Sequence, residues 1–296
     1  MQPKICFIGL GMMGTPMAAR LAQAGYPLSV ADADAKRAAQ FAAEHAATAV
    51  ALDGTALAEI DVVITMLPNS AIVESVLLGE DGKGGLLPQL RPGACVIDMS
   101  SSEPLRSRAL AATLAARGVQ FLDAPVSGGV KRAIDGSLAI IVGGDAAVFE
   151  AQRALLATMG KSLFHVGPAG AGHAVKALNN YVSAAGLVAT VEALRVGERF
   201  GVDPGAITDV LNASSGSNNT TQNKVKQFML NGAFNSGFSL QLMTKDLGIA
   251  MQLGRDLDYA MPLGDETLAL WANAAKSLDR VADHTEMYRL LDGSRH

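Results

Sequence analysis

ICFIGLGMMGTPMAARLAQAG (residues 5–25) begins with a short apolar run that is typical of a buried strand. Residues 16–24 then have the apolar spacing of a helix. Between the two, Gly9, Gly11 and Gly14 fit the pattern G-x-G-x-x-G. In that pattern the first glycine permits a tight turn, the second lets the backbone approach a pyrophosphate, and the third lets helix and strand pack closely. The segment therefore predicts a strand, a dinucleotide-binding turn and a helix.

An acidic residue follows at the distance that this motif requires. Asp32 ends the next apolar run, 18 residues after Gly14, where a carboxylate can accept hydrogen bonds from the adenosine ribose. A 2′-phosphate there would meet negative charge, at a cost of about 1 kcal/mol in water and about 4 kcal/mol near a protein surface. We therefore predict NAD rather than NADP, although Lys36 and Arg37 lie close in sequence. The alternative is that Asp32 only caps the following helix.

Strands and helices alternate through the first half of the chain. Parallel strands need crossover connections, which are usually helices, so this alternation predicts an α/β fold with a Rossmann-type doubly wound parallel sheet. The predicted strands are residues 5–8, 28–31, 61–66, 95–98, 120–122, 137–142 and 161–166, and the predicted helices are 16–24, 34–44, 71–78 and 105–116.

The second half has a different pattern. Residues 170–200 form one long helical pattern that Gly201 ends, and Asp203 and Pro204 supply an N-cap and a first-turn proline for the next helix. We find no convincing strand beyond residue 170. The sequence predicts an NAD-binding Rossmann domain over residues 1–165 and an all-helical C-terminal domain over residues 166–296.

Composition excludes several classes of protein. The chain has 296 residues, of which 49% are hydrophobic and 18% charged, which is typical of a globular enzyme. Its net charge is −4 and no basic run is present, so nucleic acid is not expected as a partner. Cys6 and Cys95 lie within apolar runs and lack a metal-binding neighbourhood, so we expect neither a metal site nor a disulfide. No signal peptide or long apolar span appears, so we expect a cytoplasmic protein without membrane contact.

Four polar residues recur along one face of the long helix. Lys176, Asn179, Asn180 and Ser183 fall at i, i+3, i+4 and i+7. A lysine can take the proton of an alcohol and return it, provided that burial or a nearby positive charge lowers its pKa from about 10.4. Asparagines are poor helix formers and would be unusual choices for solvation alone. The alternative is an ordinary solvated face.

A second candidate segment follows the strand at 120–122. Ser127, Gly128 and Gly129 can offer a hydroxyl and exposed backbone N–H groups to a carboxylate. The alternative is a plain flexible turn. Lys131 and Arg132 are additional basic candidates for an acidic substrate.

Taken together, the motifs resemble those of the β-hydroxyacid dehydrogenases, a family that includes 3-hydroxyisobutyrate dehydrogenase and tartronate semialdehyde reductase. Six motifs occur in the family's order: FIGLGMMGTPMAARLAQAG (7–25), ITMLPN (64–69), DMSS (98–101), DAPVSGG (123–129), GHAVKALNN (172–180) and KDLGIA (245–250). The resemblance covers nearly the whole chain. There are two departures, since Arg20 stands where asparagine is common and Ser101 replaces the commoner threonine.

The resemblance implies an NAD-dependent oxidoreductase that interconverts a small 3-hydroxy carboxylic acid and its semialdehyde or keto form, as a homo-oligomer (dimer or tetramer). It implies that Lys176 is catalytic, and that the helical domain over residues 166–296 serves substrate binding and oligomerisation. Family members do not need a histidine at the place of His173, so we interpret this residue as a supporting residue and not as the base. Substrate contacts are implied for Ser127, Gly128, Gly129 and Asn180, to which the helix face adds Asn179. Besides the glycine turn, dinucleotide contacts are implied for Met12, Met13, Asp32, Leu67, Pro68, Ser101 and Lys245.

Three alternative functions stay open. Tartronate semialdehyde (2-hydroxy-3-oxopropionate) reductase belongs to the same family. Imine reductases share the fold but commonly lack the lysine that Lys176 provides. A non-catalytic NAD sensor would have no reason to keep Lys176, Asn180 and the Ser127–Gly129 turn together.

Overall fold

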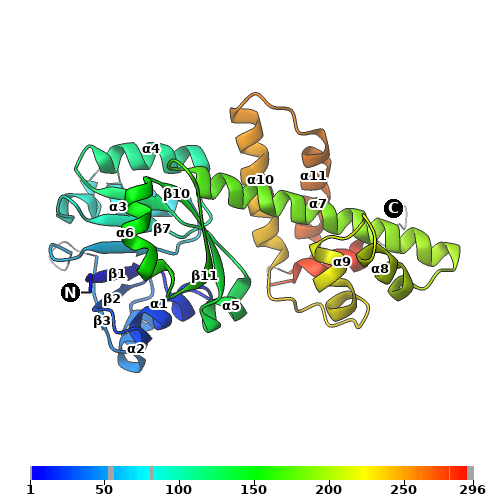
Figure 1. Ribbon diagram of the computed structural model, residues 1–296, viewed down its shortest axis with the longest axis horizontal. Helices are drawn as coiled ribbons and strands as arrows, with labels where there is room; N and C mark the ends of the chain where they lie inside the picture. The colour runs from blue at the N-terminus through cyan, green and yellow to red at the C-terminus, as the bar shows by residue number, and fades with distance from the viewer. Residues whose placement is uncertain (1, 53–56, 81–82, 280, 292–296) are drawn as a thin grey trace. The chain divides into compact units, whose positions relative to one another are not determined.

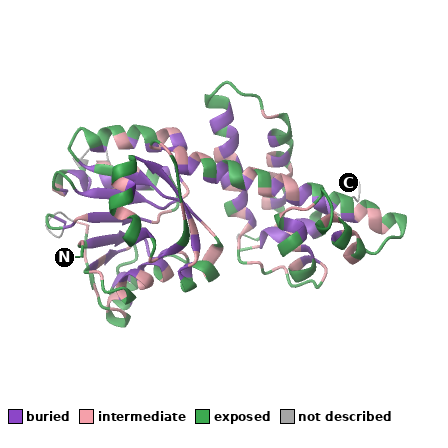
Figure 2. Ribbon diagram, in the orientation of Figure 1, coloured by how far each residue is buried: buried purple, intermediate pink, exposed green. Residues whose placement is uncertain are grey.

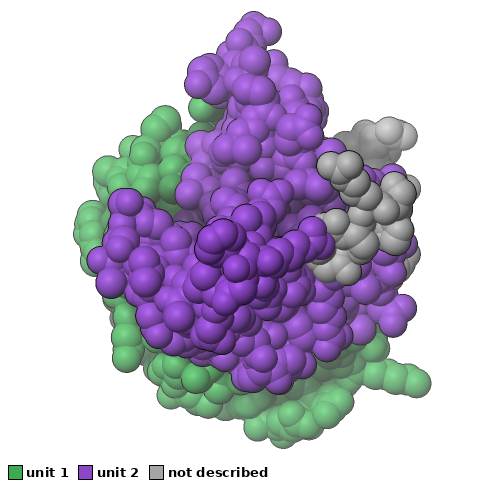
Figure 3. Space-filling model, turned by 90° about the vertical axis from the view of Figure 1, so that its right-hand side faces the viewer, with its two compact units in different colours: residues 1–176 green, residues 177–296 purple. Residues whose placement is uncertain are grey.

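The computed structural model describes all residues except 1, 53–56, 81–82, 280 and 292–296. The chain forms two compact units, Met1–Lys176 and Ala177–His296, which Figure 3 shows in different colours. Helix α7 (Ala171–Phe200) contributes to both. The sequence predicts a division of the chain by function, into a cofactor-binding domain that ends at residue 165 and a helical domain that begins at residue 166. That functional division remains a prediction.

The first unit contains one large sheet (Figure 1). Its strand order is β11-β10-β8-β7-β4-β1-β2-β3, with β9 paired to β10. From β3 to β8 all neighbours are parallel, as predicted. The strands are β1 (Ile5–Ile8), β2 (Leu28–Ala31), β3 (Ala47–Ala49), β4 (Val62–Thr65), β7 (Cys95–Asp98), β8 (Gln120–Asp123), β9 (Val126–Ser127), β10 (Leu138–Gly144) and β11 (Gly160–Gly167).

Strand β10 departs from the predicted all-parallel arrangement. It is antiparallel to β8 and β9, although it is parallel to β11. The reason is that Val126 and Ser127 pair directly with residues of β10, so the chain turns back through α5 (Gly129–Asp135) instead of crossing the sheet. The prediction of a purely parallel sheet was therefore wrong at this edge.

Alternating side chains of the strands bury two separate cores, which makes the sheet doubly wound. Ile5 and Phe7 of β1 belong to one cluster, and Cys6 and Ile8 belong to the other, because successive side chains point to opposite faces. Figure 2 shows these strands as buried. Helices α1 (Gly14–Gln23), α2 (Ala35–Glu44) and α6 (Ala146–Leu156) contribute to the first cluster, and α3 (Ser70–Leu78) and α4 (Pro104–Ala115) contribute to the second.

The predicted elements are all present in the described chain, and their ends differ from the prediction by two residues or fewer. Strands β1, β2 and β7 have the predicted bounds. The sequence reading missed β3, β9, α5, α6, the short hairpin of β5 (Gly79–Glu80) and β6 (Lys83–Gly84), and the 3-10 turn Leu87–Gln89.

The described part of the second unit is helical, as predicted. Asp203 caps α8 by accepting a hydrogen bond from the Ala206 N–H, and Pro204 takes the first helical position. Trp271 is fully buried within the core of this unit. No described helix is both long and apolar enough to cross a membrane. After α7 come α8 (Pro204–Asn212), α9 (Asn219–Asn223), a π-helix (Val225–Met229), α10 (Leu240–Asp256), α11 (Pro262–Ser277), a 3-10 turn (His284–Glu286) and α12 (Met287–Leu290).

Candidate functional site

The three motif positions require glycine for different structural reasons. Gly9 has a φ of +100°, and a Cβ there would collide with the Met66 carbonyl oxygen, while a Cβ on Gly14 would collide with the Gly9 carbonyl oxygen. At Gly11, by contrast, a Cβ would meet no described atom within 4 Å. Gly9 and Gly14 are therefore fixed by packing, and the space at Gly11 is open to a ligand. This pattern fits a pyrophosphate that approaches the backbone.

Asp32 connects the glycine turn to the end of β2. Its Oδ2 accepts a hydrogen bond from the Leu10 N–H at 2.7 Å. Its Oδ1 accepts from the Asp34 N–H at 2.9 Å and lies 3.3 Å from Nη1 of Arg37. The N-cap of α2 is Asp34, whose carboxylate accepts the N–H groups of Lys36 and Arg37. The alternative that Asp32 caps this helix is therefore wrong.

Four parallel strands bring most of the predicted cofactor residues to one edge of the sheet. The glycine turn follows β1, Asp32 follows β2, Leu67 and Pro68 follow β4, and Ser101 follows β7. The chain order reverses between β1 and β4, and ligands of such sheets bind beyond the carboxyl ends of the strands at this switch point. Lys245 is on α10, in the second unit.

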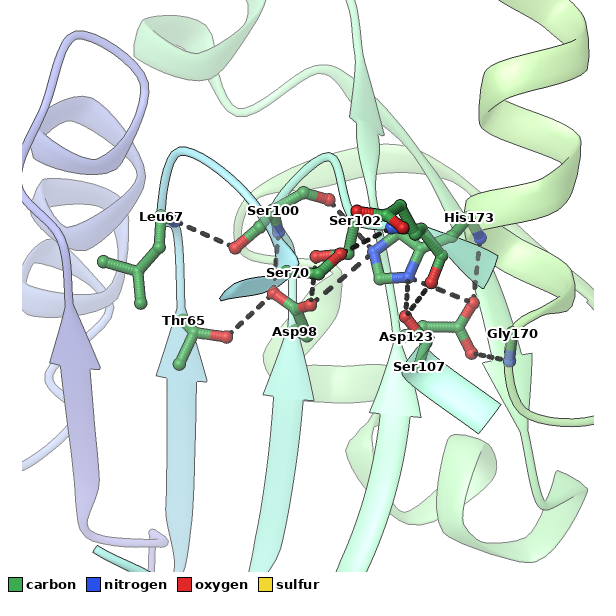
Figure 4. A network of polar contacts seen from close by, with 11 residues as sticks. Thr65, Leu67, Ser70, Asp98, Ser100, Ser102, Ser107, Asp123, Gly170 and His173 are labelled. Atoms are coloured by element: carbon green, nitrogen blue, oxygen red, sulfur yellow. Dashed lines mark hydrogen bonds and ion pairs between the residues drawn. The ribbon is translucent and has the colours of Figure 1, made fainter. Parts of the chain in front are cut away.

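A buried polar network lies at the same edge (Figure 4). Asp98, at the end of β7, accepts hydrogen bonds from Thr65 Oγ1 at 2.9 Å, from Ser102 Oγ at 2.8 Å and from the Ser100 N–H at 3.0 Å. The Leu67 N–H donates to Ser100 Oγ at 2.9 Å. The side chains of β4 and β7 thus fix the two turns that carry predicted cofactor residues.

His173, in the first turn of α7, extends this network to β8. Its Nε2 lies 3.0 Å from the Ser100 carbonyl oxygen, and its Nδ1 lies 2.7 Å from Ser107 Oγ. Asp123 accepts the backbone N–H groups of His173 at 2.8 Å and of Gly170 at 2.7 Å. Burial raises the pKa of the Asp123 carboxyl, and the nearby His173 acts in the opposite direction. The sequence reading did not assign Asp98 or Asp123, although each ends an apolar strand.

The turn predicted to bind a carboxylate has two residues with positive φ. Gly128 has a φ of +131° and Gly129 a φ of +68°, and α5 starts directly after Gly128. A Cβ on Gly128 would lie 2.5 Å from Cδ of Arg132. A side chain at this position would therefore displace Arg132, whose stem lies over the turn.

The residues on the polar face of α7 differ in how far they are buried. Lys176 is 8% exposed and Asn180 is 5% exposed, whereas Asn179 is exposed. The Asn180 amide donates to Oδ2 of Asp246 at 2.6 Å, and its own oxygen accepts from Asn179 at 3.2 Å. Lys245 Nζ lies 3.9 Å from the other oxygen of Asp246. Because Lys176 and Asn180 are buried, the alternative of an ordinary solvated face is wrong for these two residues.

Arg20, the departure in the first motif, has a packing role. Its Nε lies 3.4 Å from the Thr158 carbonyl oxygen, and its guanidinium lies over Gly136, where a Cβ would be only 2.8 Å from Nε. The residue thus connects α1 to the segments that precede β10 and β11.

Neither cysteine has a partner for a disulfide or a metal. Cys6 and Cys95 are free and buried, and burial raises the pKa of each thiol to about 12. Within the described chain no group of three or more His, Cys, Asp or Glu residues could hold a metal ion.

A separate groove of about 820 Å³ opens on the first unit. It lies against Ala111 of α4 and the ends of β10 and β11, at Gly144 and His165. No predicted site residue lines it.

Comparisons with known proteins agree with this arrangement. The family model of the NAD binding domain of 6-phosphogluconate dehydrogenase matches residues 4–167, and the model of the NAD-binding domain of NADP-dependent 3-hydroxyisobutyrate dehydrogenase matches residues 170–291. The chain is similar to 2-(hydroxymethyl)glutarate dehydrogenase of Eubacterium barkeri, with 37% identity over 88% of this chain and 85% of the relative. It is also similar to NAD-dependent L-serine dehydrogenase of Pseudomonas aeruginosa, with 36% identity over 98% of both chains.

Among solved structures, the fold matches 3-hydroxyisobutyrate dehydrogenase of Mycobacterium tuberculosis, described with L-serine. The TM-score is 0.90 and the identity is 34%, over 98% of this chain and 99% of the other. One family model covers more than half of the chain, and relatives above 30% identity align over most of their length. The chain therefore belongs to the β-hydroxyacid dehydrogenase family, as a 3-hydroxyisobutyrate dehydrogenase-like, NAD-dependent dehydrogenase of hydroxy acids.

Proposed function

We propose that the enzyme oxidises a small 3-hydroxy carboxylic acid to its semialdehyde, and catalyses the reverse reduction, with Lys176 as the acid/base. The observation that carries this proposal is the burial of Lys176 on α7, one helical turn after His173 and its network. The names of the relatives support the substrate class. 3-Hydroxyisobutyrate, L-serine and 2-(hydroxymethyl)glutarate all carry a CH₂OH group on the carbon next to a carboxylate.

The residues of the first unit fit the cofactor. The open space at Gly11 accommodates a pyrophosphate, and the Asp32 carboxylate has acceptor capacity left for ribose hydroxyls. We propose that Met12, Met13, Leu67, Pro68, Ser101 and Lys245 complete the dinucleotide site and that NAD is preferred over NADP. In this scheme residues 1–165 bind the cofactor, and residues 166–296 provide substrate contacts and subunit contacts.

The proton steps follow from the chain's own side chains. The dinucleotide that these residues would hold would supply the acceptor for the hydride of the alcohol carbon. Lys176 takes the hydroxyl proton as the carbonyl forms, and in the reverse direction it returns that proton to the developing alkoxide. We propose that Ser127, Gly128, Gly129, Asn179 and Asn180 hold the carboxylate and hydroxyl of the substrate.

The test is NADH formation, followed by absorbance, across a panel of 3-hydroxy acids that includes glycerate, with NAD and NADP. Lys176→Met keeps an unbranched chain as long as the lysine stem up to Cε and removes the amine, so turnover should fall by about 10²- to 10⁴-fold while NADH affinity stays unchanged. Lys161→Met, at an exposed lysine of β11, is the matched control and should keep full activity.

The outcomes separate the competing functions. Parallel loss of turnover and NADH affinity in Lys176→Met would contradict the assigned role. NADH formation from glycerate alone would assign the tartronate semialdehyde reductase branch, because that aldehyde is the oxidation product of glycerate. Tight NADH binding without turnover of any acid would instead favour an imine substrate or an NAD sensor.

We also propose that the protein is a cytoplasmic homo-oligomer, a dimer or a tetramer. Three large apolar side chains of α7 support an oligomer, because Val182 is 67%, Val196 69% and Phe200 87% exposed. Two free thiols fit a reducing compartment.

A further inference from the structure

We propose that His173 is a positioning residue that fixes the place of Lys176 relative to the cofactor-binding edge of the sheet. The inference depends on the proposed role of Lys176. It goes beyond that role because it names the residue that sets the position of the acid/base.

Three hydrogen bonds hold His173 to three different segments. Nε2 donates to the Ser100 carbonyl oxygen at 3.0 Å, because a carbonyl can only accept. Nδ1 pairs with Ser107 Oγ of α4 at 2.7 Å, and the backbone N–H donates to Asp123, at the end of β8. The carboxylates of Asp98 and Asp123 flank the ring at 3.8 Å and 3.7 Å. These contacts leave the imidazole a single orientation.

The helix transmits this constraint to Lys176. Residues at i and i+3 lie on the same side of a helix and are about 4.5 Å apart along its axis. The first turn is closed by the bond from the Ala174 N–H to the Gly170 carbonyl at 3.0 Å, and the Gly170 N–H itself donates to Asp123. Rotation or sliding of this turn would therefore move Lys176 together with His173.

The same network holds the turns that are proposed to contact the cofactor. Ser100 accepts from His173 through its carbonyl and from the Leu67 N–H through its hydroxyl, and it directly precedes Ser101. One buried cluster thus sets the position of Lys176 and of two cofactor-binding turns. Hydride and proton transfer both require that Lys176 and the cofactor be held in fixed relative positions, since a displacement of about 1 Å can lower the rate by about 10²-fold.

His173 does not qualify as the base itself. It is 1% exposed, and both ring nitrogens already have partners within the protein. It therefore acts through Lys176, and substitution should change kcat without comparable change in cofactor affinity.

The main variant is His173→Phe, which keeps a ring of similar size and removes both ring hydrogen bonds. We expect kcat to fall by about 10- to 100-fold, with KM for NAD changed by no more than about twofold. His173→Gln retains a side-chain N–H that can reach the Ser100 carbonyl, so it should recover part of kcat. Amide hydrogen exchange of residues 171–176 should become faster in His173→Phe.

His165→Phe is the matched control. His165 also bonds to one backbone carbonyl, that of Gly144 at 2.8 Å, and its ring stacks on Phe149; none of its hydrogen bonds among the described residues reaches the network. It should keep wild-type kcat. If His173→Phe fails to fold, Ser107→Ala removes the Nδ1 partner, together with a local bond from Ser107 Oγ to the Glu103 carbonyl oxygen at 3.2 Å, and should still lower kcat severalfold.

Two results would overturn the inference. One is a folded His173→Phe or Ser107→Ala enzyme with wild-type kcat. The other is a fall in kcat that is matched by an equal loss of NAD affinity and by lower thermal stability, which is the signature of general loosening. If the wild-type protein oxidises no hydroxy acid, the proposed function fails instead, and unchanged exchange at residues 171–176 in His173→Phe then decides against the positioning role.

Discussion

Asp32→Asn isolates the charge that should select NAD over NADP. The substitution keeps one oxygen that can accept from the Leu10 N–H, so the glycine turn should retain its conformation. It removes the negative charge from a side chain that is only 9% exposed. It also releases Arg37, which the Asp32 carboxylate holds at 3.3 Å.

The size of the effect follows from Coulomb's law. A 2′-phosphate within about 4 Å of the carboxylate is opposed by about 1 kcal/mol in water and by about 4 kcal/mol near a protein surface. A free-energy difference of about 1.4 kcal/mol changes a rate or equilibrium constant tenfold. The ratio of kcat/KM for NAD to kcat/KM for NADP should therefore decrease in Asp32→Asn by a factor of about 5 to about 1000. The low exposure of Asp32 favours the upper part of this range.

The assay compares initial rates with both cofactors at saturating acid. Asp34→Asn is the matched control, because it removes a neighbouring charge that is 51% exposed and replaces one good helix cap with another. Its cofactor ratio should change far less than that of Asp32→Asn. An unchanged ratio in Asp32→Asn, or an equal change in both variants, would refute the reasoning.

Two further predictions concern stability and assembly. Burial and the nearby Lys224 lower the pKa of His284 from 6.5 to about 4. The unfolded chain therefore binds a proton that the folded chain does not between these values, and stability should fall as the pH drops through this window, by about 2 kcal/mol between pH 7 and 5. Urea unfolding at several pH values, followed by the fluorescence of Trp271, which stacks on His284, measures this change. The free energy of unfolding of His284→Asn should depend less on pH than that of the wild type. An equal pH dependence in the two proteins would exclude His284 as the cause. Light scattering should give a mass of at least two chains of 30.6 kDa, and a monomer at micromolar concentration would contradict the proposed oligomer.

Elements with strong local signals were predictable from the sequence. Strands β1 and β2 end where Gly9 and Asp32 interrupt the apolar runs, and α7 ends at Gly201, so their bounds follow from neighbouring residues. Helix α6 also has a local signal, the cap at Asp145, which the sequence reading overlooked. The reversed direction of β10 has no such signal, because it depends on pairing with β8 and β9.

The candidate site also combines local features that the sequence predicted with long-range contacts that it did not. The positive φ of Gly9 and the close packing of Gly14 depend on a short loop, and the motif alone predicted both. The contact between His173 and Ser100 joins residues 73 positions apart, and the contact between Asn180 and Asp246 joins residues 66 apart. Single-sequence patterns specify that a buried polar side chain needs a partner, but they do not specify which one.

Helix α7 also limits how this chain can vary in length. At 30 residues and 1.5 Å per residue it is about 45 Å long, and it runs unbroken from the compact unit that ends at Lys176 into the next. Surface loops absorb inserted residues easily, whereas one residue inserted between His173 and Asn180 would turn everything after it by about 100° about the helix axis. Over evolution this segment can exchange side chains, but additions and deletions should accumulate elsewhere in the chain.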